Sequence, residues 1–79
     1  MVAETDRIEV DPDILAGKPV VKGTRIPVYV VLEMLQDGAD RSEVIEAYPD
    51  LEKEDVKACL QYATKRVQRE GFRGKESVA

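Results

Sequence analysis

The side chains best suited to contact another molecule lie on one face of a helix that we expect over residues 53–70. At about 100° per residue, several amines and amides of this helix fall within roughly 60° of one another. They are Lys57, Gln61, Thr64 and Gln68, with Lys53 and Lys65 beside them. In the major groove of DNA, Lys pairs with guanine and Gln with adenine, and cations contact phosphates. The spacing favours a DNA contact by Lys53, Lys57, Gln61, Lys65 and Arg69, although any surface helix has a polar face.

Two absences narrow the chemistry that this chain can perform. It has no His, the commonest general base and zinc ligand, and a single Cys, Cys59, which excludes an internal disulfide and a cysteine metal cluster. The carboxylates Asp11, Asp13, Glu33 and Asp37 are too scattered in the sequence to define a site. We therefore expect a protein without catalytic activity, cofactor or metal.

The tract GKPVVKGTRIPV, from Gly17 to Val28, sets three cations between glycines and prolines. A phosphate-binding loop would need the pattern GxxxxGK[ST] before a helix, which the tract lacks. A structural interpretation is favoured: the glycines allow tight turns, and Arg25 pairs with Asp11, Asp13 or Glu33.

Charge is unevenly distributed along the chain. Residues 1–50 hold five basic and eleven acidic side chains, whereas residues 51–79 hold seven basic and five acidic ones. An acidic body with a basic end suits a protein that meets phosphate or an acidic partner at that end, although cations also favour the last turn of a helix. The first residues lack a secretion signal and no apolar run would span a membrane, so we expect a cytoplasmic protein.

The chain of 79 residues is short enough for a single domain. We expect a disordered N-terminus over residues 1–7, a β arm or hairpin over 8–26, helices at about 27–37, 41–48 and 53–70, and a flexible tail over 71–79. Pro27 suits a first helical position, Gly38 a left-handed stop, and Asp40 with Glu43 a capping box.

The longest helix has an apolar stripe of Val56, Leu60, Ala63 and Val67, which we expect to face the core, with Cys59 at its margin. The short helix before it and the link of about four residues give helix-turn-helix proportions. The predicted fold class is mainly α, a three-helix homeodomain-like helix-turn-helix bundle with a short N-terminal β arm.

A homodimer is expected because so short a chain buries only about 60% of its unfolded surface. Val30 and Met34 widen the apolar stripe of the first helix beyond the needs of one small core. The predicted dimer or partner contacts are Ile8, Val10, Val20, Val30, Met34 and, in the tail, Phe72.

The tract GKPVVKGTRIPV and the later run YPDLEKEDV resemble the prokaryotic domain of unknown function number 433, and the resemblance extends from Ile8 to Val67. It implies a helix-turn-helix bundle with an N-terminal β arm that takes part in dimerisation. It also implies kinship with VapB-type antitoxins, which neutralise PIN-like ribonuclease toxins and repress their own operons. Family members commonly carry Thr or Ser where this chain has Glu52, so a weaker helix cap and a more acidic groove-facing end are expected.

The sequence therefore predicts an antitoxin-like, DNA-binding homodimer with a PIN-like toxin and operator DNA as partners. The alternative is a protein-interaction module that forms a homodimer or binds the product of a neighbouring gene without touching DNA. The acidic start of the longest helix and the negative net charge favour this alternative.

Overall fold

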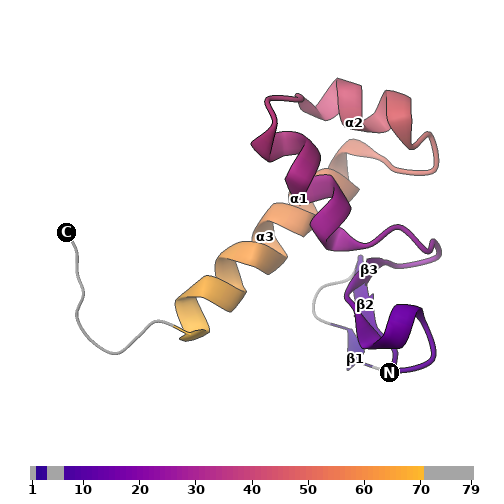
Figure 1. Ribbon diagram of the computed structural model, residues 1–79, viewed down its shortest axis with the longest axis vertical. Coiled ribbons are helices and arrows are strands. Elements are labelled where there is room, and N and C mark those ends of the chain that lie inside the picture. The colour runs from indigo at the N-terminus through magenta and orange to yellow at the C-terminus, as the bar shows by residue number, and fades with distance from the viewer. Residues whose placement is uncertain (1, 4–6, 71–79) are drawn as a thin grey trace.

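A computed structural model describes residues 2–3 and 7–70 of the chain. In chain order, its elements are β1 (Val2–Ala3), β2 (Ile8–Val10), a 3-10 turn η1 (Leu15–Gly17), β3 (Val20–Val21), α1 (Val28–Gln36), α2 (Arg41–Ala47) and α3 (Lys53–Glu70). The small sheet lies near the start of α1, at the opposite end of the molecule from α2 (Figure 1). The predicted class, a mainly helical three-helix domain with a short N-terminal β element, is confirmed.

The sheet is antiparallel, in the order β1-β2-β3. Ile8 pairs with Val21 and Glu9 with Val20, while Val2 and Ala3 pair with the other edge of β2. The prediction of disorder over residues 1–7 is therefore wrong for the residues described there. That prediction left one edge of the Ile8–Val10 strand unpaired, although an open strand edge readily accepts another strand.

The helix ends follow the local signals in the sequence. Gly38 has a φ of 101° and stops α1, as predicted. The capping box of α2 is also confirmed: the Glu43 N–H donates to Asp40 Oδ1 (2.9 Å), and the Asp40 N–H donates to Glu43 Oε1 (2.8 Å). Pro27 is the extended residue before α1 rather than its first helical residue, with φ −68° and ψ 146°.

The core is assembled by β2, β3 and all three helices. Its buried members are Ile8, Val21, Val28, Val31, Val44, Leu51, Val56, Ala58, Cys59 and Tyr62. Cys59 is fully buried rather than marginal. Among the helices of the described residues, none combines the length and the apolar character needed to cross a lipid bilayer.

The buried face of α3 differs from the predicted one. Asp55, Cys59 and Tyr62 form the buried line of α3, the row of its side chains that faces the core. Leu60, in contrast, is 39% exposed and Val67 is 69% exposed. Two causes act. Leu60 precedes the buried Tyr62 and lies about 100° around the helix from Cys59, so it faces away from the core. Val67 is exposed because α3 has 18 residues, whereas α1 has nine and α2 has seven. The last turns of α3 extend past the other two helices, so their apolar side chains lie outside the core (Figure 1).

The turn η1 was not predicted. Leu15, Ala16 and Gly17 all have positive φ (49°, 57° and 86°), which makes this a left-handed turn. Its N–H groups bond to the preceding carbonyls, from Gly17 to Ile14 (3.0 Å) and from Lys18 to Leu15 (3.2 Å). A side chain in this region costs about 1 kcal/mol or more, so the turn is strained at its two non-glycine residues. It fixes the position of the next residues, Lys18 and Pro19.

Candidate functional site: an apolar groove between α1 and α3

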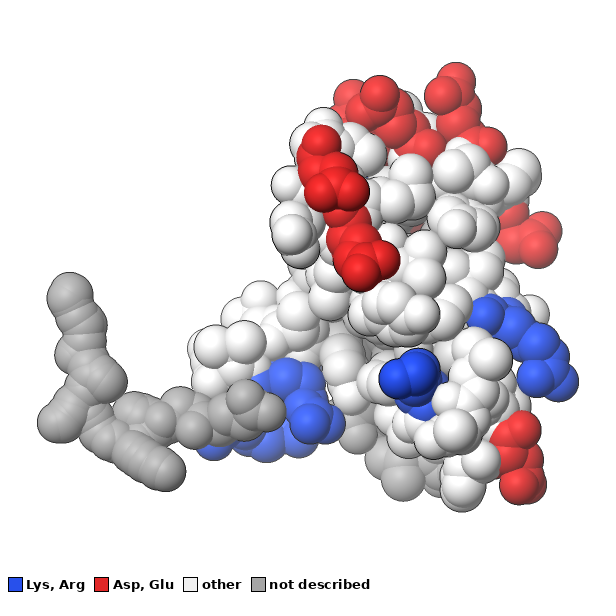
Figure 2. Space-filling view, in the orientation of Figure 1, with Lys and Arg blue, Asp and Glu red and all other residues white. Residues whose placement is uncertain are grey.

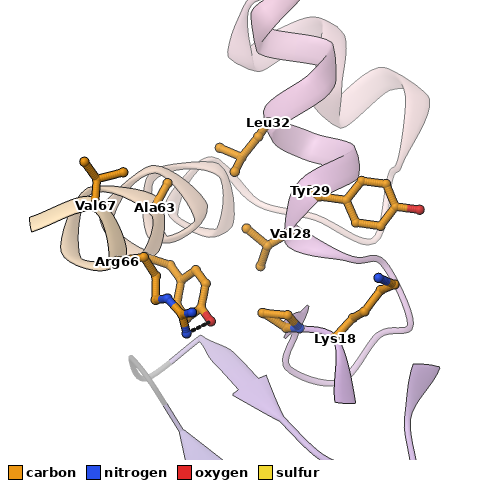
Figure 3. Close-up of a pocket in the computed structure, with 9 residues that line it drawn as sticks. Lys18, Val28, Tyr29, Leu32, Ala63, Arg66 and Val67 are labelled. Carbon is orange, nitrogen blue, oxygen red and sulfur yellow. Dashed lines mark hydrogen bonds between the residues drawn. The ribbon is translucent and has the colours of Figure 1, made fainter. Parts of the chain in front are cut away.

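An apolar groove lies between α1 and the second half of α3. It has a volume of about 450 Å³. Its lining residues are Lys18, Pro19, Val28, Tyr29, Leu32, Tyr62, Ala63, Arg66 and Val67. Figure 3 shows Val28 and Leu32 pointing from α1 toward the side of α3 that carries Ala63 and Val67.

The groove has a buried floor and exposed walls. Val28 and Tyr62 belong to the core, with 3% and 8% of their surfaces exposed. Tyr29, at the rim, is 50% exposed, and Val67 is exposed as described above. The groove exists because α3 continues beyond the part of α1 that covers it. Leu60, which precedes Tyr62 on α3, is also partly exposed, so apolar surface extends along the helix beyond the groove.

Two cations stand at the rim, each beside a tyrosine ring. Lys18 Nζ lies 5.6 Å from the centroid of the Tyr29 ring, and the Arg66 guanidinium carbon lies 5.9 Å from that of Tyr62. Arg66 Nη1 also donates a hydrogen bond to Tyr62 Oη (3.4 Å). No acidic residue lines the groove, and the ion pairs found among residues 7–69 do not involve Lys18 or Arg66. The groove therefore combines an apolar floor with positive charge that no carboxylate of residues 7–69 offsets.

The polar face predicted on α3 is exposed. Lys53, Lys57 and Gln61 lie opposite the buried line of α3, and Lys65 and Arg69 are exposed nearer its end. Contact of these side chains with DNA stays a prediction.

The surroundings of that face are acidic. Glu54 is exposed in the first turn of α3, and Glu52 is exposed just before it. Red acidic side chains cover the α2 end of the molecule, whereas blue basic ones gather at the opposite end (Figure 2). The exposed acidic residues of α1, α2 and the adjoining loops are Glu33, Asp37, Asp40, Glu43, Glu46 and Asp50. In helix-turn-helix docking, this end of the molecule would approach the phosphates, which it would repel.

Arg7 connects the sheet to the start of α3. Its Nη1 lies 2.9 Å from Asp55 Oδ1 and 3.1 Å from Glu52 Oε1. These hydrogen bonds raise the pKa of the Arg7 guanidinium above its usual value. The Glu52 N–H donates to Asp55 Oδ2 (2.8 Å), so the helix start gains its side-chain cap from Asp55 while Glu52 binds Arg7.

The predicted dimer contacts divide into three groups. Ile8 and Val20 are fully buried within the chain, which makes them core residues; their side chains do not supply a contact surface. Val10, Val30 and Met34 are half-buried, and their contact with a partner stays a prediction. Phe72 lies outside the described residues. The expected ion pair of Arg25 with Asp11, Asp13 or Glu33 does not form among the described residues, where the Arg25 side chain is exposed.

Cys59 is unsuited to reactivity. Burial, and secondarily the nearby charge of Asp55, raises the pKa of its thiol to about 12. Within residues 2–3 and 7–70, no three metal-ligating side chains come together.

Sequence reasoning missed the groove because it assigned Leu60, Ala63 and Val67 to the core. A usable signal was present: an apolar stripe that runs to the end of an 18-residue helix cannot be covered by shorter neighbours.

Comparisons with known proteins identify relatives without naming an activity. A family described as "Protein of unknown function (DUF433)" matches residues 8–63. The "Uncharacterized protein y4eO" of Sinorhizobium fredii is 38% identical over 63 residues, which cover 80% of this chain and 28% of that protein. A crystal structure of a DUF433 member protein from Anabaena variabilis superposes with a TM-score of 0.73 at 30% identity, covering 80% of this chain and 62% of that one. The chain thus spans less than two thirds of the length of both.

Proposed function

The chain belongs to the DUF433 family of proteins of unknown function, and from this premise we propose that it is a non-catalytic regulatory module that binds another protein through the groove between α1 and α3. The observation that carries the proposal is the groove itself, because exposed apolar surface beside polar residues marks protein contact sites. In a similar protein, the matching region is a small part of a much longer chain, as expected of a binding module.

An antitoxin-like role is one form of this proposal. In it, the groove engages a PIN-like ribonuclease toxin encoded by a neighbouring gene and so neutralises the toxin. The antitoxin role requires that the chain bind its toxin tightly, and the groove supplies the apolar surface for such a contact.

A cross-linking experiment tests the groove directly. A photoreactive phenylalanine analogue is placed at Val67, which is exposed in the groove, and, as a control, at Gln68, which is exposed on the other side of α3. The protein is expressed with the product of the neighbouring gene. A mass-spectrometrically identified adduct from position 67 but not from 68 supports the proposal.

Calorimetry then measures the affinity of the purified pair. Val67→Glu is expected to weaken binding by tenfold or more, because it places a charge on apolar contact surface, whereas Gln68→Glu should leave the affinity within about twofold. Equal effects of the two substitutions would refute the groove as the contact surface.

DNA binding with operon autoregulation is the second candidate function. The observation in its favour is that Lys53, Lys57, Gln61 and Lys65 are all exposed. A gel-shift titration on the upstream region of the gene tests it at low salt. Lys57→Glu together with Lys65→Glu should abolish the shift. Phosphate contacts by the four cations Lys53, Lys57, Lys65 and Arg69 would give a salt slope of about −3.6. Binding unchanged by the double substitution would remove these residues from the DNA site.

We also propose a homodimer in which Val10, Val30 and Met34 contribute to the contact. Sedimentation velocity at micromolar concentration checks it. Met34→Glu should shift the protein to monomer, and a monomeric parent protein would refute the proposal.

A further inference from the structure

We propose that the groove between α1 and α3 takes an acidic segment of a partner protein, with large apolar side chains flanked by carboxylates. This inference rests on the proposed function, since it specifies the chemistry of the partner that the groove binds. Three features of the groove lead to it.

The first feature is apolar surface that is longer than a small ligand needs. The buried Val28 and Tyr62 form a floor for one large side chain. Val67 continues the groove along α3, and Leu60, two turns earlier on nearly the same line of that helix, is partly exposed. An amphipathic helix that lies in a groove uses such a row of apolar contacts at successive turns.

The second feature is charge of one sign. The whole chain has 16 acidic and 12 basic residues, yet the groove is lined by two cations and no anion. Lys18 and Arg66 have no carboxylate partner among residues 7–69 in the ion pairs of the structure. A segment with carboxylates on either side of its apolar side chains would meet opposite charge on both walls.

The third feature is the fixed position of both cations. The stacking of Lys18 against Tyr29 and of Arg66 against Tyr62 restrains the two charged groups at the rim of the groove without neutralising them. The left-handed turn before Lys18 and the Arg66–Tyr62 hydrogen bond add to this restraint. Side chains that are already positioned lose less conformational entropy when they bind a partner.

The chain's own last residues are poorly suited to the groove by charge. Residues 71–79 hold Arg73 and Lys75 against the single acidic residue Glu76, and their net positive charge would meet the cations of the rim. A partner segment of opposite charge is therefore favoured over the tail.

Nuclear magnetic resonance titration of the full chain tests the inference. The probe is a synthetic helical peptide of about 14 residues, with Leu at i, i+3, i+4 and i+7 and Glu at the other positions. Two matched peptides replace every Glu by Lys or every Leu by Ala. We expect the first peptide to shift the amide signals of Leu32, Ala63 and Val67. The other two peptides should bind with at least tenfold lower affinity. The amide signals of Lys53 and Lys57 should not shift.

Charge-reversed proteins provide the second arm. Lys18→Glu with Arg66→Glu should lower the affinity for the acidic peptide by about tenfold or more and raise that for the Lys peptide. Lys22→Glu with Arg25→Glu makes the same change of net charge at exposed positions outside the groove and should stay within about twofold.

Each other outcome overturns the inference. Equal binding of the Glu and Lys peptides at the groove would leave a protein-binding groove without the acidic preference. No shift at the groove with the acidic peptide at millimolar concentration would reject the acidic occupant, while the cross-linking experiment would still decide the proposed function. Groove signals that shift with protein concentration alone would identify a second copy of this chain as the occupant.

Discussion

Replacing Asp55 with alanine is expected to destabilise the fold by about 1 to 2 kcal/mol. Asp55 is 7% exposed, and its two oxygens bind different groups. Oδ2 accepts the Glu52 N–H (2.8 Å) and Oδ1 accepts Arg7 Nη1 (2.9 Å). Loss of the hydrogen bond at the helix start costs about 1 kcal/mol, and leaving the Glu52 N–H without its acceptor adds up to about 1 kcal/mol. The pair with the partly exposed Arg7 adds little to this sum.

Thermal and urea unfolding followed by circular dichroism measure this loss. For a domain of this size, about 1 to 2 kcal/mol corresponds to a decrease in Tm of roughly 4 to 16 °C. The matched control is Glu54→Ala, one residue earlier in the same helical turn, which removes the same charge from an exposed position. Its cost should be about 0.5 kcal/mol, the value of a carboxylate near a helix N-terminus.

The reasoning is refuted if Asp55→Ala and Glu54→Ala cost the same. In that case, charge at the helix start would account for the whole effect, and the hydrogen bond from the Glu52 N–H to Asp55 would add nothing. Asp55→Asn separates the contributions further, because it keeps one acceptor oxygen and loses the charge. Its cost should fall between those of the two alanine variants.

Three further predictions concern the turn η1, Cys59 and the start of α2. Ala16→Gly should raise the free energy of unfolding by about 0.5 to 1 kcal/mol in urea titrations, because glycine adopts a φ of 57° without a Cβ clash; a loss of stability would contradict the strain. Burial raises the pKa of Cys59 from 9.0 to about 12, so the folded chain keeps the thiol proton that the unfolded chain releases. The contribution of the protonated Cys59 thiol to the free energy of unfolding is fully present below about pH 9 and declines as the pH rises toward 12. The difference in unfolding free energy between the parent and Cys59→Ala should show this decline. Asp40→Ala should cost about 1 kcal/mol in the same assay because it removes the capping box of α2, and an unchanged midpoint would show that the box contributes little.

The charges at the groove and at the acidic end of the molecule indicate which kind of partner each surface suits. A helix-turn-helix protein that reads DNA brings α2 and the start of α3 to the phosphates, and here that region carries Glu43, Glu46, Glu52 and Glu54. The cations Lys18 and Arg66 instead border an apolar groove away from that end. Charge thus favours a protein partner at the groove over DNA at α3, and the two titrations proposed above separate these functions.

Local signals in the sequence determined the helices. Gly38 allows a φ that other residues avoid, and Asp40 with Glu43 satisfies N–H groups within four residues of chain, so neither feature depends on distant contacts. The predicted bounds of α3 agree with the structure because Pro49 and the polar residues after Leu51 separate it from α2. The exposure of Lys53, Lys57 and Gln61 likewise followed from helical periodicity.

Tertiary structure alone decided which side of α3 is buried and where the groove lies. Val56, Leu60, Ala63 and Val67 form as regular a stripe as any in the sequence, yet only the first of them belongs to the core. Periodicity shows which residues share a face, but burial requires another element at the same height, and α1 and α2 are too short to cover the whole of α3. The pairing of Arg7 with Asp55, 48 residues later, was equally beyond local reasoning. It arises because packing of Ile8 into the core brings its neighbour to the start of α3.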